Sequence, residues 1–426
     1  MKSIKKVILL CVAVMLAGVF AAGCGMLSDN IEYAVVSERV LSADGRFYYD
    51  LYENGTATVT GRTAADYHMN IPAKLDGHPV TAIGEQAFQG DKALRCVTLE
   101  GGVKTVRGGA FNGCTYLTKI DLGGSVRTVG DSAFYGCQVL CEVAGTDKLE
   151  RIEDFAFVQC ASLSFIDIPE SVTYIGEQAF FGCTSLAALK LPEGECVVGD
   201  SAFSYCESLC RVELGGISAI SAGMFENCIA LVKIDIGNNV TTVGERAFRG
   251  CAELGEVYIS KSVKYIGGSA FDETLWLTSS TDEFLTVGDG ILLRYNGTDT
   301  NVTVPDKVKL VADAFCGNTS IRSVTVGGKV EQIGDYAFIG CTQLNKVTVT
   351  GKVSRIGASA FASCTALTAV YLPDSVQTVD SYAFGNCPSL VSVKYGGNAA
   401  AWEKIQLAKG NEQLYLADIA YSAKAD

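Results

Sequence analysis

Apolar residues recur at fixed intervals along this chain of 426 residues, and a single phenylalanine marks each interval. In the stretch GGAFNGCTYLTKIDL, residues 108–122, the apolar positions are Phe111, Cys114, Leu117, Ile120 and Leu122. The phenylalanine returns as Phe88, Phe111, Phe134, Phe157, Phe180, Phe203, Phe225, Phe248, Phe271, Phe315, Phe338, Phe361 and Phe384. Successive members are 23 residues apart, except for one interval of 22 and one of 44. A register held for so long indicates one repeat architecture rather than several unrelated domains.

Each period predicts two short strands joined by turns. Residues 117–122 alternate near their end and are β-branched, which is typical of a strand. Gly-Gly at 123–124 predicts a turn, 126–129 a second extended piece, and 131–132 a short turn or single helical turn. No unit can bury its own apolar face, so the units must stack. We therefore predict an α/β repeat fold, a continuous right-handed solenoid of leucine-rich-repeat type that is β-rich, with a parallel strand ladder, short helical turns and the phenylalanines in its core.

Cysteine follows the phenylalanine by three residues in ten units, out of 17 cysteines in the chain. These ladder cysteines are Cys114, Cys137, Cys160, Cys183, Cys206, Cys228, Cys251, Cys341, Cys364 and Cys387. Each has an equivalent neighbour on both sides, so geometry selects no unique disulfide partner. Three units instead carry Asp91, Thr274 or Asn318, which are also small and able to hydrogen-bond a turn. We predict buried, reduced thiols, because a metal site would need a CxxC pair with histidine rather than the repeat period.

The N-terminal residues have the pattern of an export signal. Three lysines precede an apolar run over residues 7–20, too short for a membrane-spanning helix of about 20 residues. The following Ala-Ala-Gly-Cys, ending at Cys24, resembles a bacterial lipobox, in which the cysteine is acylated and becomes the mature N-terminus. Ala21 stands where such boxes usually carry leucine, so plain secretion with cleavage near Ala22 is the alternative. Both interpretations predict an exported protein, and acylation of Cys24 predicts a membrane-anchored lipoprotein at the cell surface.

The charge balance argues against nucleic acid as a partner. The net charge of −13 becomes −16 once residues 1–23, with three lysines and no acid, are removed. So acidic a chain repels phosphate backbones, and no basic cluster in the sequence offsets this.

Terminal caps and one irregular repeat complete the pattern. Asn54-Gly55 between alternating runs predicts a type I′ hairpin that covers the N-terminal end. Asn398 predicts the start of a short helix over 399–404, in which Trp402 seals the last repeat. In the long interval, residues 289–305 predict another hairpin that turns at 296–297. Trp276 precedes it and is interpreted as a core residue rather than a binding aromatic.

The repeat "IGEQAFFGCTSLAALKLPEG", residues 175–194, resembles the BspA-like leucine-rich repeats of bacterial surface proteins, and the resemblance covers roughly 47–426. The resemblance implies a curved solenoid displayed outside the cell, and adhesion to host proteins or other bacteria in some members. The family has no common catalytic residues to carry over. The predicted organisation is a signal peptide (1–23), a lipid-anchored tether (24–46), an N-terminal hairpin cap (47–80), repeats (81–271), an irregular hairpin-bearing repeat (272–306), repeats (307–395) and a C-terminal cap (396–426).

The residues offer little for catalysis. His68 and His78 are the only histidines and both precede the repeats, which excludes a histidine-dependent triad among the repeats. The sequence contains no phosphate loop, dinucleotide fingerprint or HExxH motif. Paired carboxylates would need a deep cleft, whereas a solenoid offers a shallow curved face. We therefore predict a protein that is not an enzyme and that needs no cofactor and no metal.

A binding site is expected on the outward positions of the main strands, taken here as the concave face. Most of these positions are small or carry charges of mixed sign, which is typical of a solvated surface. The exceptions are Phe165, Arg211, Tyr258 and Tyr371, and aromatic residues and arginine are enriched at interface hot spots. Their spread over many repeats favours an extended protein surface as the ligand.

The leading hypothesis is a monomeric adhesin or binding module for extracellular or host proteins or glycoproteins. A structural envelope lipoprotein without a specific ligand is the alternative. Carbohydrate binding would require aromatics clustered within one or two repeats, and the sequence does not show such a cluster.

Overall fold

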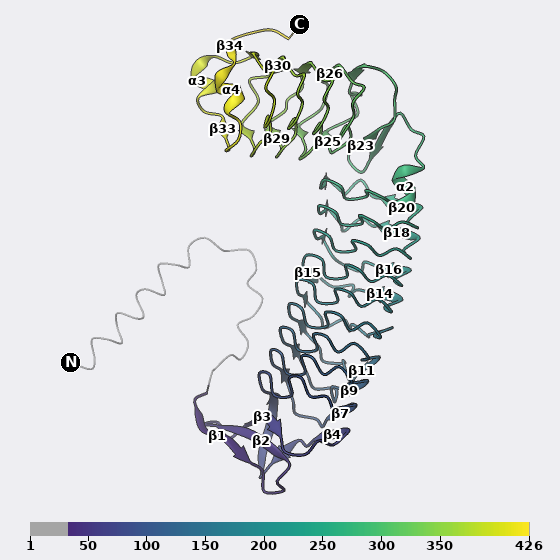
Figure 1. Cartoon of the computed structure of the whole chain (residues 1–426), viewed down its shortest axis with the longest axis vertical. Helices are drawn as coiled ribbons and strands as arrows, with labels where there is room; N and C mark the ends of the chain where they lie inside the picture. The colour runs from purple at the N-terminus through teal and green to yellow at the C-terminus, as the bar shows by residue number, and fades with distance from the viewer. Residues whose placement is uncertain (1–32, 426) are drawn as a thin grey trace, which may run out of the picture.

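The computed structural model describes residues 33–425 and shows a β-solenoid that bends into a C shape (Figure 1). Two ladders of mainly parallel strands run along the solenoid, which confirms the predicted fold class. The longer strands follow the outer side of the bend, and two-residue strands follow its inner side. The placement of the longer strands on the concave side is therefore wrong. The predicted signal peptide and Cys24 lie outside the described residues.

The outer ladder carries the segment that the sequence predicts as the main strand of each repeat. Its strands are β4 (His68–Ile71), β7 (Cys96–Leu99), β9 (Lys119–Asp121), β11 (Glu142–Ala144), β14 (Ala188–Lys190), β16 (Arg211–Glu213), β18 (Lys233–Ile236), β20 (Glu256–Ile259), β24 (Asn301–Thr303), β26 (Ser323–Val326), β28 (Lys346–Val349), β30 (Ala369–Leu372), β32 (Ser392–Tyr395) and β34 (Asp418–Ala420). They form four separate sheets, β11-β9-β7-β4, β14-β16, β18-β20 and β24 through β34.

The inner ladder carries the second, shorter piece of each repeat. Its strands are β8 (Thr105–Val106), β10 (Thr128–Val129), β12 (Arg151–Ile152), β13 (Tyr174–Ile175), β15 (Val197–Val198), β17 (Ala219–Ile220), β19 (Thr242–Val243), β21 (Tyr265–Ile266), β25 (Leu310–Val311), β27 (Gln332–Ile333), β29 (Arg355–Ile356), β31 (Thr378–Val379) and β33 (Gln406–Leu407). In most of these two-residue strands one side chain points into the core and the other outward, as Val129 is buried and Thr128 is not. Both residues of β25 are buried, because β25 lies between the two segments.

Turns, not helices, carry the phenylalanine of each repeat. A third ladder of backbone hydrogen bonds runs through these turns, as the amides of Gly109, Phe111 and Gly113 donate to carbonyls of the next repeat at 2.8 Å. The predicted short helical turns are therefore absent from the regular repeats within residues 33–425. The helices of the described chain are α2 (Leu275–Thr278), α3 (Ala399–Trp402) and α4 (Glu412–Leu416).

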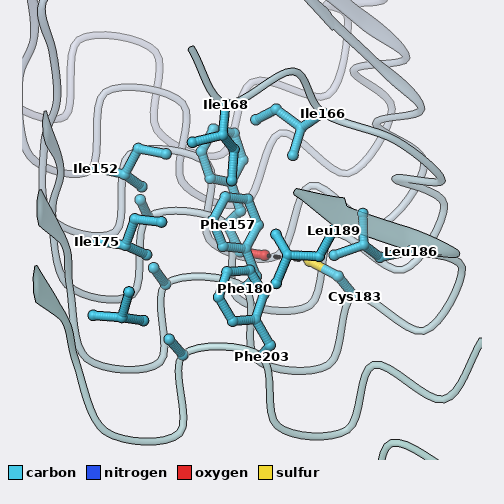
Figure 2. Close-up of a cluster of buried hydrophobic side chains, with 14 of the residues drawn as sticks. Ile152, Phe157, Ile166, Ile168, Ile175, Phe180, Cys183, Leu186, Leu189 and Phe203 are labelled. Carbon is cyan, nitrogen blue, oxygen red and sulfur yellow. Dashed lines mark hydrogen bonds between the residues drawn. The ribbon is translucent and has the colours of Figure 1, made fainter. Parts of the chain in front are cut away.

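The phenylalanines stack through the core, as predicted. Phe157 and Phe180 have ring centroids 5.1 Å apart and planes within 6°, and Phe203 continues the stack (Figure 2). Ile152 and Ile175 of the inner ladder pack beside these rings. A fully buried phenylalanine side chain contributes on the order of 2–3 kcal/mol, so the stack is a main source of stability.

The ladder cysteines lie beside the phenylalanine stack as buried thiols. The Sγ atom of Cys183 donates to the carbonyl of Phe157 in the preceding repeat at 3.2 Å (Figure 2). All ten ladder thiols make the equivalent bond, at 3.0–3.4 Å. The side chains of Asp91 and Asn318 cap a turn at the same position, and Thr274 bonds the Phe271 carbonyl. The predicted packing role of these residues therefore agrees with their contacts.

The repeat of 22 residues interrupts both strand ladders. The structure records no pairing of β15 with β17 or of β16 with β18, although the turn ladder continues through Phe203 and Met224 at 3.0 Å. Gly215 has φ +56°, and a Cβ there would collide with the carbonyl oxygen of Pro192. The shortened loop thus depends on glycine to pass this close to the preceding repeat.

The N-terminal cap is a β-sheet that begins earlier than the sequence predicts. Its strands are β1 (Val35–Leu41), β2 (Phe47–Tyr52), β3 (Ala57–Arg62), β5 (Lys74–Leu75) and β6 (His78–Ile83). Strand β1 pairs with β2, so part of the predicted tether belongs to the cap. The predicted hairpin forms from β2 and β3, but only Gly55 of its turn has positive φ, so the type I′ prediction is wrong. A three-residue loop with a single left-handed glycine explains the difference.

The C-terminal cap begins with the predicted helix, although α3 ends at Trp402 rather than at 404, and the cap also contains β33, α4 and β34. Asn398 accepts a hydrogen bond from the amide of Ala401 at 2.9 Å and begins α3. Trp402 is buried and packs edge-on against Tyr395, with ring centroids 5.2 Å apart.

The long interval between Phe271 and Phe315 divides the solenoid into two segments, residues 33–278 and 284–425. The buried side chains form two hydrophobic cores, and the first also includes Leu285, Ile291, Leu293, Leu310 and Ala312 of the second segment. The antiparallel strands β22 (Phe284–Val287) and β23 (Ile291–Tyr295) form the shared wall, because Ile291 packs in the first core and Leu292 in the second. The prediction of one continuous core is therefore wrong. The hairpin also turns at 288–290 rather than at the predicted 296–297.

Candidate functional site

The exposed side chains of the longer strands, together with those of residues 163–168 at the equivalent position, form a surface that we call the outer strand face. Phe165 is 61% exposed and Tyr258 57% exposed, although both are large hydrophobic residues. Arg211 is also exposed, and within residues 33–425 no ion pair is recorded for it. These three predicted residues therefore point outward from the first segment.

Phe165 occupies a repeat that lacks an assigned outer strand. Residues 163–168 form no strand, and the sheet β11-β9-β7-β4 ends one repeat before them. The side chains of Ile166 and Ile168 remain buried, so the chain keeps its inward contacts there while the outer ladder is interrupted. Phe165 thus stands at a break between two sheets.

The charged positions of the outer strand face are partly compensated across neighbouring repeats. Lys119 bonds Glu142 at 2.6 Å, and Lys233 lies 3.6 Å from Glu256. The ammonium group of Lys233 also lies 5.0 Å from the ring centroid of Tyr258, which is a cation–π geometry. Exposed pairs of this kind contribute little to folding stability.

Tyr371 does not join the other three predicted residues. It is half-buried on β30, in the second segment beyond the bend, where a Cβ on Gly396 would lie 3.0 Å from its hydroxyl. The structure therefore brings Phe165, Arg211 and Tyr258 onto one segment and separates Tyr371 from them.

Sequence reasoning overlooked the inner ladder as a second exposed face. The guanidinium of Arg151 lies 4.1 Å from the ring centroid of Tyr174, and Val197 of the next repeat is 59% exposed. All three stand six residues before the phenylalanine of their repeat. A comparison of the residues six positions before each phenylalanine would have identified them from the sequence.

A hollow of about 650 Å³ opens where the two segments meet, and we call it the junction hollow. Its walls come from β20, α2, the hairpin turn and the loop before β25. The residues that line it are Val257, Ile259, Lys261, Trp276, Thr286, Val287, Gly288, Asp289, Gly290, Lys307 and Lys309. Trp276 packs edge-on against Phe271 at 5.0 Å between centroids, so it serves the core and also borders this hollow.

Lysine dominates the charge of the junction hollow. Asp289 is the one acidic residue in its lining, and its carboxylate accepts hydrogen bonds from Lys264 and Lys309 at 2.8 Å each. These bonds lower the pKa of Asp289 to about 2. Lys261 and Lys307 are exposed, and no ion pair is recorded for either within residues 33–425.

In residues 33–425, the ladder thiols and His78 make structural contacts. Burial raises the pKa of Cys183 to about 12, which disfavours the thiolate. The ring nitrogen Nδ1 of His78 lies 3.0 Å from the carbonyl oxygen of Gly55 and holds the N-terminal cap. No set of three potential ligand side chains for a metal ion was found in residues 33–425. In the same residues, no helix has the length and apolarity to cross a bilayer.

Comparison with known proteins addresses the repeats directly. The model of the BspA type leucine rich repeat region matches residues 74–187, 180–283 and 295–406, with six copies. No curated protein sequence matched the chain. The match indicates no catalytic family, and proteins with these repeats are typically exposed on bacterial surfaces.

Solved structures with similar folds come from several bacteria. A leucine-rich repeat protein from Bacteroides ovatus is 22% identical with a TM-score of 0.49, and the match covers 88% of this chain and 98% of that one. A leucine rich cell surface protein from Faecalibacterium prausnitzii is 24% identical with a TM-score of 0.43, covering 87% and 98%. A leucine-rich repeat protein from T. pallidum is 29% identical with a TM-score of 0.39, covering 51% and 91%.

The family model covers well over half of the chain, and its repeats coincide with the stacked phenylalanine units of the structure. The chain therefore belongs to the family of bacterial proteins with BspA-type leucine-rich repeats.

Proposed function

We propose that this protein is a non-enzymatic binding module, displayed on the cell surface, whose outer strand face binds an extracellular protein or glycoprotein. The observation that supports the proposal is the exposure of Phe165 and Tyr258 on the outer strand face. The same face carries the exposed Arg211, for which no ion pair is recorded in residues 33–425. Exposed aromatics stabilise the fold little, whereas aromatic and arginine side chains carry much of the affinity at protein interfaces. An adhesin role in contact with host or bacterial surfaces would use such a face.

The experiment measures binding of purified residues 25–426 to a panel of immobilised extracellular matrix and serum glycoproteins. For a ligand found in this way, we expect Phe165→Ala or Tyr258→Ala to raise the dissociation constant roughly thirtyfold, which corresponds to about 2 kcal/mol. Tyr371→Ala should have a smaller effect, because this side chain is half-buried. All three variants should keep the parent melting temperature within about 3 °C.

Tyr135→Ala is the matched control, since Tyr135 is 39% exposed but lies on the turns rather than on the outer strand face. Unchanged affinity in all three outer-face variants would reject this face as the binding surface. Absence of any ligand on the panel would favour the structural envelope role instead.

A further inference from the structure

One rung of the outer ladder is missing at the junction. Within the described residues, β20 pairs only with β18, and β24 pairs only with β26. Residues 279–282 stand where the other repeats place their outer strand relative to the phenylalanine, but they form no strand. The outer ladder is therefore open on both sides of the junction.

The open edge of β20 offers backbone groups to a further strand. The amide of Glu256 donates to Val232 and that of Ser260 to Ile236, so the even-numbered residues face β18. In a parallel ladder the intervening residues present their amides and carbonyls to the opposite side. Those residues are Val257 and Ile259, and no hydrogen bond to their backbone is recorded in residues 33–425. Both line the junction hollow.

The missing rung also leaves apolar surface uncovered. Ile234 and Ile236 of β18 are 1% and 0% exposed, because β20 and the next repeat cover them. Their counterparts Val257 and Ile259 are only partly buried. Trp276 borders the same space, so an inserted strand would find an apolar floor for its inward side chains.

The charge around the hollow selects the partner. Lys261 and Lys307 lie on its rim without recorded ion pairs, and Lys309 already shares Asp289 with Lys264. Asp306 precedes Lys307 in the chain, and the Glu331 carboxylate contributes to the raised pKa of Lys309. A lysine excess here contrasts with the net charge of −13 for the chain. The lysine excess favours a ligand with carboxylate groups and disfavours a basic segment.

From these features we propose that the junction hollow binds an extended acidic peptide segment of an extracellular partner protein, which adds to β20 as the missing rung. Main-chain hydrogen bonds to Val257 and Ile259 supply affinity, as in other cases of strand addition. Inward apolar side chains contact Trp276, and acidic side chains face Lys261 and Lys307. The volume of about 650 Å³ lies within the range of about 300–1,000 Å³ that is usual for ligand sites. This site goes beyond the proposed outer-face function and does not depend on it.

The test uses purified residues 25–426 and a fluorescent peptide of about nine residues, in which aspartate or glutamate alternates with valine or phenylalanine. Fluorescence anisotropy at low salt should show saturable binding that weakens as the salt concentration rises. Lys261→Glu combined with Lys307→Glu should raise the dissociation constant at least about tenfold, because two attractive contacts become repulsive. The matched control combines Lys190→Glu with Lys346→Glu, because both lysines are exposed on the outer ladder. This variant should change the dissociation constant of the peptide less than about twofold.

A second pair of variants tests strand addition itself. Ile259→Pro removes the amide that faces the hollow and leaves the bonds to β18 in place, so it should weaken peptide binding about tenfold. Ile259→Val keeps that amide and should bind like the parent. Melting temperature and circular dichroism check that each variant is folded.

Three results would overturn the proposal. A peptide with lysine in place of its acidic residues would bind as tightly as the acidic peptide, or the double variant of Lys261 and Lys307 would bind the peptide as tightly as the parent does. In the third, Ile259→Pro and Ile259→Val would have equal affinity for the peptide. Binding of sialyllactose with no binding of the peptide would also overturn it, in favour of an anionic saccharide. Phe165 lies on the outer strand face away from β20, so Phe165→Ala should leave peptide binding unchanged, which separates this site from the outer strand face.

Discussion

At the scale of single residues, each turn except that of Phe315 holds two left-handed positions, two residues before and two residues after the phenylalanine. Glycine occupies the second position in several repeats, as at Gly113 and Gly182. Elsewhere side chains with a Cβ adopt the same conformation, as Gln159 does at φ +57°. The turn ladder requires this geometry, since the Gln159 amide donates to the carbonyl of Phe181 in the next repeat. The ladder therefore imposes a local cost that glycine avoids.

This cost predicts a stabilising substitution. Gln159→Gly should raise the free energy of unfolding by about 0.5–1 kcal/mol, because a residue with a Cβ pays about that much or more in the left-handed region. Chemical denaturation of the variant and the parent measures the change. Gln89→Gly is the control, because Gln89 lies in an equivalent turn without positive φ, and glycine there should be neutral or destabilising. Equal effects of the two substitutions would contradict the strain argument.

The ladder thiols lead to a second prediction at this scale. They should be free in the folded protein and unreactive until it unfolds, because they are buried and burial raises the pKa of members such as Cys183. Alkylation of the native protein at pH 8 should label the exposed Cys141 and Cys210 first. Denaturation without reductant should expose all ten ladder thiols to the reagent. A count below half of that number would show that the ladder contains disulfides.

At the scale of elements, the Asp313 carboxylate replaces a missing backbone acceptor of the turn ladder at the junction. In regular repeats the amide two residues before the phenylalanine donates to a backbone carbonyl of the next repeat, as Ser132 does to Asp154. The repeat after Phe271 is irregular, and the amide of Ser269 instead donates to the Asp313 carboxylate of the second segment. Burial, with a contribution from nearby Asp272, raises the pKa of Asp313 to about 6.

The raised pKa predicts how the contact depends on pH. Between about 4 and 6 the folded protein holds the Asp313 proton more tightly than the unfolded chain, whose pKa is near 3.8. The contribution of this group to stability therefore falls as the pH rises through that window. Asp313→Asn keeps an acceptor for Ser269 without the charge. It should be more stable than the parent at pH 7 by on the order of 1–3 kcal/mol, and about equal to the parent at pH 3.5.

Thermal unfolding of both proteins from pH 3.5 to 7 checks this prediction. Asp306→Asn is the control, because Asp306 is exposed in the loop before β25. The melting temperature of this variant should change with pH as that of the parent does. A difference between Asp313→Asn and the parent that stays constant across the pH range would contradict the assignment.

Features that repeat along the chain can be predicted from the sequence, and most features that occur once cannot. The stacked phenylalanines, the thiol ladder and the Asn398 cap follow from local spacing repeated many times, so the sequence alone predicts them. The turn at 288–290 and the second core do not repeat, and Asn296-Gly297 suggested the wrong hairpin. The junction hollow arises from a strand that does not form between β20 and β24, and the sequence pattern marks it only as the interval of 44 residues.

At the scale of the whole molecule, the bend gives the two faces different surroundings. The longer strands, such as β20 with Tyr258, lie on its outer side, and the two-residue strands, such as β15 with Val197, line its inner side (Figure 1). The segments touch on the inner side, where the hydroxyl of Tyr265 lies 3.4 Å from the Asp335 carboxylate. A large ligand thus has unobstructed access to the outer strand face, while the junction hollow suits a single extended segment.

Anchoring through Cys24, which the lipobox-like sequence predicts, would orient this bent molecule. The residues between Cys24 and the first described residue, Tyr33, span at most about 30 Å, so the N-terminal cap would lie near the membrane and the junction and second segment farther out. Cys24→Ala should then move the protein from the membrane fraction to the medium, measured by immunoblotting of both fractions. Cys141→Ala, which changes an exposed thiol of the first segment, should leave it in the membrane fraction. If the Cys24→Ala protein sediments with membranes as the parent does, acylation at this residue is ruled out and another means of attachment must hold the cap at the surface.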